Sequence, residues 1–250
     1  MPEARRVLIL GGTTEARALA DVLHGLPGIA PITALAGRTA APLLPKGEVR
    51  IGGFGGIEGL AAVLAEERPA LLVDATHPFA ARISANAVAA AGQAGVPLLR
   101  LERSPWTAEP GDRWTIVPDL AATAAALPVA RSTVFLATGR QGLDAFAARP
   151  EHRYILRLVD PPAEDSLPVA AEVILARGPF DQDEEARLFR DRNVDIVVAK
   201  NAGGPASHAK IAAARSLGLP VILVARPALP AAPTVATVAE AVERVTAACR

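Results

Sequence analysis

The chain has 250 residues, of which 51% are hydrophobic and 4% aromatic, and its formal net charge is zero. This length suits one large domain or two modest ones, and a mostly small aliphatic apolar content favours alternating strands and helices over an aromatic-rich sandwich. The balanced charge argues against a nucleic-acid surface, and the single cysteine, Cys249, rules out an internal disulfide.

No Cys/His cluster has the spacing of a metal site, so we expect no metal. The apolar run near the first residue ends at Gly11 and is too short for a signal sequence or a membrane span. We therefore expect a cytoplasmic protein with no membrane partner and no nucleic-acid partner.

The first motif is the apolar run at 7–10, which two glycines follow at once. Apolar residues then recur at helical spacing, which predicts a strand, a glycine turn and a helix over 15–25. Such a turn lets a pyrophosphate approach the main chain at the positive end of the helix. Thr13 and Ala16 replace the later glycines of G-x-G-x-x-G, so an ordinary strand–helix turn is the alternative. The predicted cofactor contacts here are Gly11, Gly12, Thr13, Thr14 and Glu15.

A second strand is predicted over 29–36, and it ends in Gly37, Arg38 and Thr39. An acidic residue at this position would bind the ribose 2′-hydroxyl of NAD, but here an arginine stands beside a hydroxyl. That pair suits a 2′-phosphate, so the three residues predict NADPH binding. A solvated loop arginine is the alternative interpretation.

A short strand at 49–51, a glycine-rich turn at 52–56 and a helix over 57–67 lead to a fourth strand over 70–73. A carboxylate, a hydroxyl, an imidazole and an aromatic ring follow that strand within six residues. The stretch lies at the carboxyl end of a parallel strand, where open α/β sheets bind ligands. We predict that it contacts the cofactor; a capped helix start with a structural histidine is the alternative. The stretch comprises Asp74, Ala75, Thr76, His77, Pro78 and Phe79.

A helix over 82–94 and a fifth strand over 96–100 complete a predicted sheet of order 3-2-1-4-5. Polar residues, proline and both tryptophans then cluster over 100–114, so we place the domain boundary between residues 102 and 103. The first domain is then 1–102 and the second 103–250. Arg103 and Trp106 either line a pocket for a flat acidic ligand or pack between domains.

The second half repeats the pattern, with a helix over 119–127 and strands over 133–137, 154–159, 173–176, 194–199 and 221–225. An acidic run at 181–185 is expected to cap a helix, and a closing helix is predicted over 235–248. Polar residues follow the strand ends, namely Thr138, Gly139, Arg140, Lys200, Asn201, Gly203 and Arg226. Lys200 either binds a carboxylate or phosphate, acts as an acid, or is a surface lysine.

Three stretches, Leu10–Arg17, Asp74–Ala80 and Ala199–Gly203, together resemble the precorrin-6A reductase family of cobalamin biosynthesis. Ala202 stands where the family has serine. The resemblance covers nearly the whole chain and implies two Rossmann-like parallel-sheet domains with a tetrapyrrole in the cleft between them. It also implies that NADPH delivers a hydride to precorrin-6A, or to its cobalt form, giving the 6B compound.

An acidic tetrapyrrole would suit a cationic site. The predicted substrate contacts are Arg103, Thr138, Gly139, Arg140, Lys200, Asn201, Gly203 and Arg226. His77 or Lys200 is the candidate proton donor, with water or a substrate carboxylic acid as alternatives, and the chain is expected to act as a monomer. Rival functions are another NADP-dependent reductase or epimerase, an NADP-sensing module without catalysis, and a sugar-nucleotide transferase.

Overall fold

The computed structural model describes residues 4–37, 41–162, 167 and 171–250. The chain forms two compact units, the first comprising Met1–Ser104 and Pro227–Arg250 and the second Pro105–Arg226. Within the described residues each unit holds one six-stranded sheet, and every strand pair is parallel. The predicted class of two parallel α/β domains is therefore confirmed.

The first sheet has the order β12-β5-β4-β1-β2-β3. Its strands are β1 (Arg5–Leu10), β2 (Ile29–Leu35), β3 (Glu48–Ile51), β4 (Leu71–Asp74), β5 (Leu98–Leu101) and β12 (Thr234–Val235). Its helices are α1 (Thr14–His24), α2 (Ile57–Glu67), α3 (Ala81–Ala94) and α7 (Val238–Ala248). The predicted order 3-2-1-4-5 is confirmed, and β12 adds a strand beside β5.

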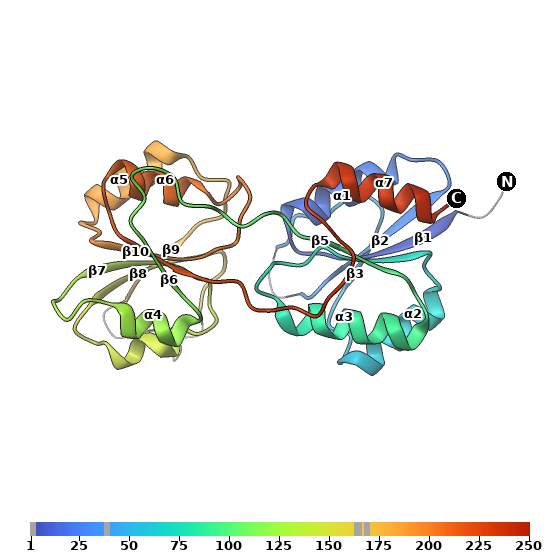
Figure 1. Cartoon of the computed structure of the whole chain (residues 1–250), viewed down its shortest axis with the longest axis horizontal. Helices are drawn as coiled ribbons and strands as arrows, with labels where there is room; N and C mark the ends of the chain where they lie inside the picture. Colours follow the sequence, from blue (N-terminus) through green and yellow to red (C-terminus); the bar gives the residue numbers. More distant parts are fainter. Residues whose placement is uncertain (1–3, 38–40, 163–166, 168–170) are drawn as a thin grey trace. The chain divides into compact units, whose positions relative to one another are not determined.

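Helices cover both faces of this sheet, α1 and α7 on one side and α2 and α3 on the other (Figure 1). β1 shows why its sequence is continuously apolar: Val7 and Ile9 join the core under α1 and α7, while Leu8 and Leu10 join the core under α2 and α3. A strand buried on both faces needs apolar residues at every position rather than at alternate ones.

The C-terminal segment corrects the predicted domain boundary, because residues 227–250 belong to the first unit and not the second. β12 pairs with β5, Thr234 lying opposite Arg100, and α7 buries Ala241 and Val245 in the core that α1 covers. The closing helix starts at Val238 instead of 235, since Thr237 caps it with a reciprocal capping box to Glu240.

The second sheet has the order β6-β11-β10-β7-β8-β9. Its strands are β6 (Trp114–Val117), β7 (Thr133–Ala137), β8 (Arg153–Leu158), β9 (Ala171–Leu175), β10 (Ile196–Lys200) and β11 (Val221–Val224). Its helical elements are α4 (Leu120–Ala126), the 3₁₀ helix η1 (Leu143–Ala148), α5 (Gln182–Asp191) and α6 (Ala209–Ser216). β6 was not among the predicted strands, and it forms because Trp114–Val117 pairs in register with β11.

The acidic run at the start of α5 has the predicted capping role, since the Asp181 carboxylate accepts the N–H groups of Asp183 and Glu184 at 2.8 and 3.2 Å. Glu185, one turn into the helix, is buried and forms an ion pair with Arg157 of β8. The Arg157 guanidinium also lies 3.6 Å from the centroid of the Phe180 ring. This pairing supplies the charge that a buried carboxylate requires.

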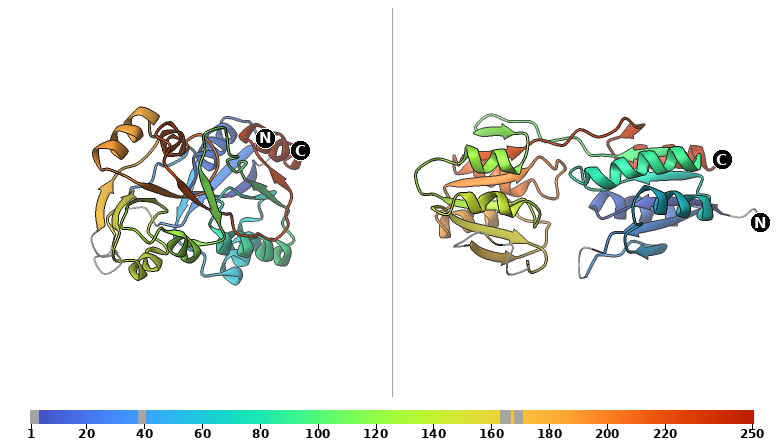
Figure 2. Two further views of the ribbon diagram at one scale, coloured as in Figure 1. Left: turned by 60° about the vertical axis from the view of Figure 1, so that its left-hand side comes forward. Right: turned by 90° about the horizontal axis from the view of Figure 1, so that it is seen from below.

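The chain passes between the units twice, once between Ser104 and Pro105 and once between Arg226 and Pro227 (Figure 2). The second unit is thus inserted into the first. Both connections are single segments of chain. Because of the insertion, β5 and β12, which pair in the first sheet, come from parts of the sequence on either side of the second unit.

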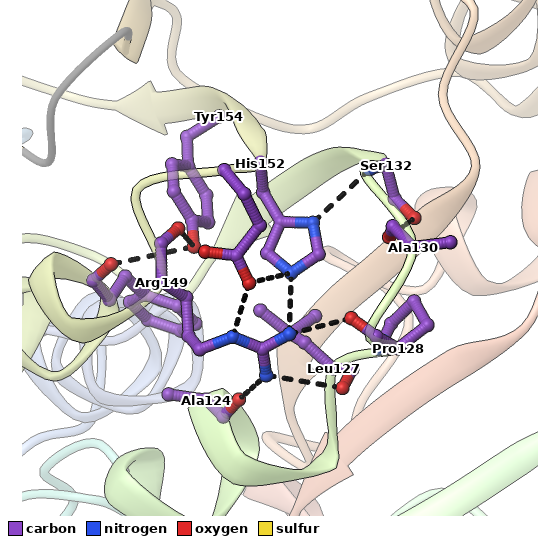
Figure 3. A network of polar contacts seen from close by, with 10 residues as sticks. Ala124, Leu127, Pro128, Ala130, Ser132, Arg149, His152 and Tyr154 are labelled. Carbon is purple, nitrogen blue, oxygen red and sulfur yellow. Dashed lines mark hydrogen bonds and ion pairs between the residues drawn. The ribbon is translucent and has the colours of Figure 1, made fainter.

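A network of polar contacts joins the segments that precede β7 and β8, at the amino-terminal edge of the second sheet, to the end of α4 (Figure 3). The Arg149 guanidinium donates to the carbonyls of Ala124, Leu127 and Pro128 at 2.9, 3.2 and 2.6 Å. Buried His152 accepts the Ser132 N–H at Nδ1, at 3.1 Å, and its Nε2 lies 3.4 Å from the Glu151 carboxylate and 3.1 Å from Arg149 Nη2. Desolvation lowers the pKa of His152 below its ordinary 6.5; Glu151 opposes this shift and Arg149 adds to it.

This network predicts a loss of stability in mild acid. Because the unfolded chain protonates His152 near pH 6.5 and the folded chain only at lower pH, the unfolded state holds more protons in that window. The free energy of unfolding should therefore fall as the pH decreases from about 7. His152→Asn, which retains an acceptor for Ser132 and does not titrate, should show a shallower dependence in urea unfolding between about pH 7 and 5. Identical slopes for the two proteins would contradict this assignment.

Candidate functional site

The turn between β1 and α1 is built by two glycines with different tasks. Gly11 permits close packing, because a Cβ there would lie 2.8 Å from the Thr33 methyl group of β2. Gly12 has φ of +110°, a conformation that favours glycine, and a Cβ there would meet no described atom within 4 Å. The main chain at Gly12 is therefore open to a ligand.

Thr13 caps α1 and joins two loops. Its hydroxyl accepts the N–H of Ala16 at 3.0 Å and donates to the carbonyl of Ala75, beyond β4, at 2.8 Å. The first-turn N–H groups of Thr14 and Glu15 have no acceptor within the helix, as at any helix start. The turn thus offers backbone donors and the positive end of α1 to an anion.

Glu15 and Arg103, predicted to contact cofactor and substrate respectively, are partners of one another. Their carboxylate and guanidinium lie 2.7 Å apart with side chains 19% and 15% exposed. Arg103 belongs to the first unit, whereas the predicted boundary had placed it in the second domain. The pair removes the negative charge that Glu15 would otherwise place beside a bound phosphate.

Asp74, the last residue of β4, organises the turn that follows it. It is 2% exposed and accepts the Thr76 N–H and hydroxyl at 3.3 and 2.7 Å, and its other oxygen meets Arg100 Nε at 3.3 Å. The Thr76 hydroxyl also lies 3.2 Å from the Ser84 hydroxyl of α3. The Asp74 carboxylate therefore shapes this turn, within a stretch predicted to contact the cofactor.

His77 is half-buried, and a hydrogen bond from the backbone of Phe79 determines which ring nitrogen carries the proton in the neutral form. Its Nδ1 accepts the N–H of Phe79 at 3.2 Å, so in the neutral ring the proton resides on Nε2. The imidazole and the Phe79 ring lie 5.8 Å apart between centroids. Protonation of Nδ1 would remove the acceptor that holds this turn.

At the end of β2, Gly37 has φ of +70°. Arg38 and Thr39, the predicted 2′-phosphate contacts, lie outside the described residues.

In the second unit the structure brings Lys200 and Thr138 side by side. Ala199 of β10 lies opposite Ala137 of β7, so the next residues, Lys200 and Thr138, stand together at the carboxyl edge. Thr138 is 3% exposed, and its hydroxyl has no hydrogen-bond partner among the described residues. Burial lowers the pKa of the Lys200 ammonium. Gly139, with φ of +77°, begins the turn that carries exposed Arg140.

Asn201 and Arg226, also predicted to contact substrate, bind the main chain at the two crossings. The Asn201 amide accepts the Trp106 N–H at 2.8 Å and donates to the Trp106 carbonyl at 3.2 Å. Arg226 donates to the carbonyls of Asn201 and Ala202 at 3.0 and 3.1 Å. Trp106 itself packs within the second unit, its indole N–H bonded to Gly204 at 2.8 Å. The loop that follows Lys200, which includes Gly203, is thereby tied to both connections.

Arg100 is the residue of this site that the sequence analysis missed. It is 6% exposed and joins Asp74 to the carbonyl of Pro230, at 3.0 Å, in the returning segment. A signal for it was available, because the predicted neighbours β4 and β5 place an aspartate and an arginine at the same edge.

These features define a two-unit parallel α/β protein with an open glycine turn before α1 in its first unit and a half-buried lysine at the carboxyl edge of the sheet in its second. Residues 6–246 match the model of the family described as precorrin-6x reductase CbiJ/CobK, and the chain belongs to this family.

Individual relatives agree with that assignment. The chain is 56% identical to precorrin-6A reductase of Rhodobacter capsulatus, over 90% of this chain and 89% of the relative. It is 30% identical to cobalt-precorrin-6A reductase of Salmonella typhimurium, over 88% and 87% of the two chains. A solved structure titled CobK precorrin-6A reductase superposes with a TM-score of 0.92 at 52% identity, covering 98% of this chain and 97% of that one. Among the described helices, none is both long and apolar enough to cross a membrane.

Thr13 provides a direct test of the first turn. Thr13→Val removes the acceptor for Ala16 and the donor to Ala75 while keeping the side-chain shape. The free energy of unfolding should fall by about 1–2 kcal/mol, measured by chemical denaturation. Thr13→Ser keeps the hydroxyl and should lose much less; equal losses for both variants would show that the hydroxyl is not the cause.

Proposed function

We propose that this protein uses NADPH to reduce one carbon–carbon double bond of the precorrin-6A macrocycle, giving precorrin-6B in cobalamin biosynthesis. The observation that carries the proposal is the 56% identity, over nine-tenths of the chain, to a relative named precorrin-6A reductase. Relatives named for the cobalt-bound substrate are more distant, at 26–30% identity, which favours the metal-free compound.

The first unit has a donor set that fits NADPH. The open main chain at Gly12 and the start of α1 suit its pyrophosphate, and the Arg103 partner of Glu15 leaves that position without net repulsion. In this proposal Gly11, Thr13 and Thr14 complete the pyrophosphate turn, and residues 74–79 bind toward the nicotinamide. Gly37, Arg38 and Thr39 would hold the 2′-phosphate. When bound, NADPH supplies the hydride.

The second unit suits an acidic tetrapyrrole. Lys200, Arg140 and the orphan hydroxyl of Thr138 stand at strand ends, where they offer positive charge and a hydrogen-bond donor to carboxylates. Gly139 and Gly203 would allow close approach of the macrocycle. Asn201 and Arg226 would contact the substrate and also hold this edge in place through their hydrogen bonds to main-chain atoms. The protein would act as a monomer.

Reduction of a double bond adds a hydride at one carbon and a proton at the other, so the reaction needs a proton donor. Lys200 fits this task better than His77. Burial lowers the pKa of Lys200 and so eases release of its proton. His77 instead accepts a backbone N–H at Nδ1, which would be lost in the imidazolium. We therefore assign the proton to Lys200 Nζ and a binding role to His77.

The first experiment is an absorbance assay of NADPH oxidation with metal-free precorrin-6A, with NADH and the cobalt-bound substrate in parallel. We expect oxidation that requires both protein and substrate and prefers NADPH, with a loss of this preference in Arg38→Ala. Binding of NADPH without oxidation by either substrate would favour the NADP-sensing alternative. An equal loss for both nucleotides in Arg38→Ala would contradict the 2′-phosphate assignment.

The role of Lys200 is tested by a matched pair of variants. Lys200→Arg retains the positive charge for substrate carboxylates, but its guanidinium does not release a proton at working pH. Turnover should fall by roughly 10²–10⁴-fold while KM changes little. Lys200→Met should lose both turnover and substrate affinity. Near-normal turnover in Lys200→Arg would show that Lys200 only binds the substrate.

A further inference from the structure

The glycine-rich turn at 52–56, which joins β3 to α2, has open main chain. A Cβ at Gly52, Gly53 or Gly55 would meet no described atom within 4 Å. Gly52 and Gly55 have φ of +134° and +79°, a region that favours glycine, but the φ of Gly53 lies outside that region. Neither packing against the described residues nor backbone conformation therefore requires a glycine at 53, whereas close approach of a ligand would require one.

Phe54 holds this turn in place. Its side chain packs against the core under α2 and α3. Its carbonyl oxygen occupies the space beside Gly59, where a Cβ would lie only 1.7 Å from it, so α2 approaches the turn closely because residue 59 is a glycine. The Leu60 N–H also donates to the Gly56 carbonyl at 3.3 Å. The open glycines thus belong to a surface whose position the core determines.

Ile51, immediately before the turn, has a side chain that the fold leaves 59% exposed at the end of β3. It lies opposite Leu35 of β2, and the Gly52 N–H donates to the Leu35 carbonyl at 2.9 Å. A Cβ at Gly37 would lie 3.4 Å from Ile51 Cγ2. Ile51 is therefore next to the residue that precedes Arg38, the proposed 2′-phosphate contact.

The strand register also places Ile51 in a row with the proposed pyrophosphate turn. Leu10 of β1 lies opposite Ala34 of β2, and Leu35 lies opposite Ile51 of β3. Gly11, which follows Leu10, is therefore level with Leu35, and a Cβ there would lie 3.2 Å from Leu35 Cδ2. Two strand spacings, roughly 10 Å, separate Gly11 from Ile51 along the carboxyl edge.

We infer that Ile51 and the main chain at Gly52 and Gly53 bind the adenine ring of NADPH. Adenine is flat and uncharged, and an exposed aliphatic side chain beside main chain without side chains offers it an apolar surface. Residues 74–79, proposed to bind toward the nicotinamide, follow β4 on the other side of β1. The two halves of the dinucleotide would then extend in opposite directions from the turn before α1. This inference rests on the proposed function, since it specifies how the same cofactor is held.

The principal test fills the open space at Gly53. Gly53→Leu adds a side chain that meets no described atom but would occupy the space assigned to the ring. Gly92→Leu is the matched control, because a Cβ at Gly92 is equally open and the last turn of α3 leads away from the carboxyl edge toward the start of β5. Ile51→Ser removes the apolar contact without adding bulk or charge. Urea unfolding checks that all three variants are folded.

Each protein is titrated calorimetrically with NADP⁺ and with adenosine 2′,5′-bisphosphate, which contains adenine but no nicotinamide. We expect Gly53→Leu to bind both ligands about tenfold or more weakly, Ile51→Ser to bind both several-fold more weakly, and Gly92→Leu to match wild type. Unchanged affinities in Gly53→Leu and Ile51→Ser would overturn the inference, as would a loss seen with NADP⁺ alone.

A third ligand separates the adenine ring from the 2′-phosphate. NAD⁺ carries the same adenine without that phosphate, so Gly53→Leu and Ile51→Ser should weaken NAD⁺ and NADP⁺ binding by similar factors. A loss confined to the two 2′-phosphorylated ligands would show that the variants disturb the phosphate contacts, and it would overturn the adenine assignment. Failure of wild type to bind any of the three nucleotides would contradict the proposed cofactor and, with it, this inference.

Discussion

The ion pair between Asp74 and Arg100 joins three separate parts of the first unit. Asp74 holds the turn at 74–79 by accepting the Thr76 N–H. Arg100, which pairs with Asp74 through Nε, is a residue of β5, and its Nη1 donates to the Pro230 carbonyl of the returning segment. Two charges at this depth are stable only as a pair, since loss of either would leave the other buried and uncompensated. The shape of the carboxyl edge of this sheet therefore depends on a contact between residues that do not themselves need to react.

A comparable arrangement exists in the second unit, where the loop after β10 holds the chain crossings. Asn201 binds the backbone of Trp106, and Arg226 binds the carbonyls of Asn201 and Ala202. Lys200 immediately precedes this loop. The position of the proposed proton donor is thus linked by hydrogen bonds to the segments at which the chain enters and leaves its unit.

Much of the fold was predictable because each early strand is a continuous apolar run bounded by turn residues. The order of β3, β2, β1, β4 and β5 follows from right-handed crossovers, and it was correct. β12 was not predictable, because a strand of two residues has no periodicity and its partner lies more than a hundred residues earlier. β6 was missed since it is an edge strand with two exposed residues, and its pattern resembles that of a loop.

For the candidate site, the sequence predicted which polar residues lie at strand ends but not which of them bind one another. Polar residues at strand ends were correctly placed at the carboxyl edges, yet sequence alone does not reveal which of them the protein itself engages. Glu15 and Arg103 lie 88 residues apart and meet only after the sheet is assembled. The same limit applies to Asn201, whose amide reaches a backbone 95 residues away.

The insertion of one unit into the other has a consequence for synthesis of the chain. All strands of the second sheet have left the ribosome before β12 and α7 are made, so that sheet can assemble while the first still lacks its edge strand and one helix. Until then the core under α1 remains without Val235, Ala241 and Val245. The unit whose residues are translated first is therefore the last to be completed, and a nascent chain stopped before residue 234 would expose apolar surface on that side of its sheet.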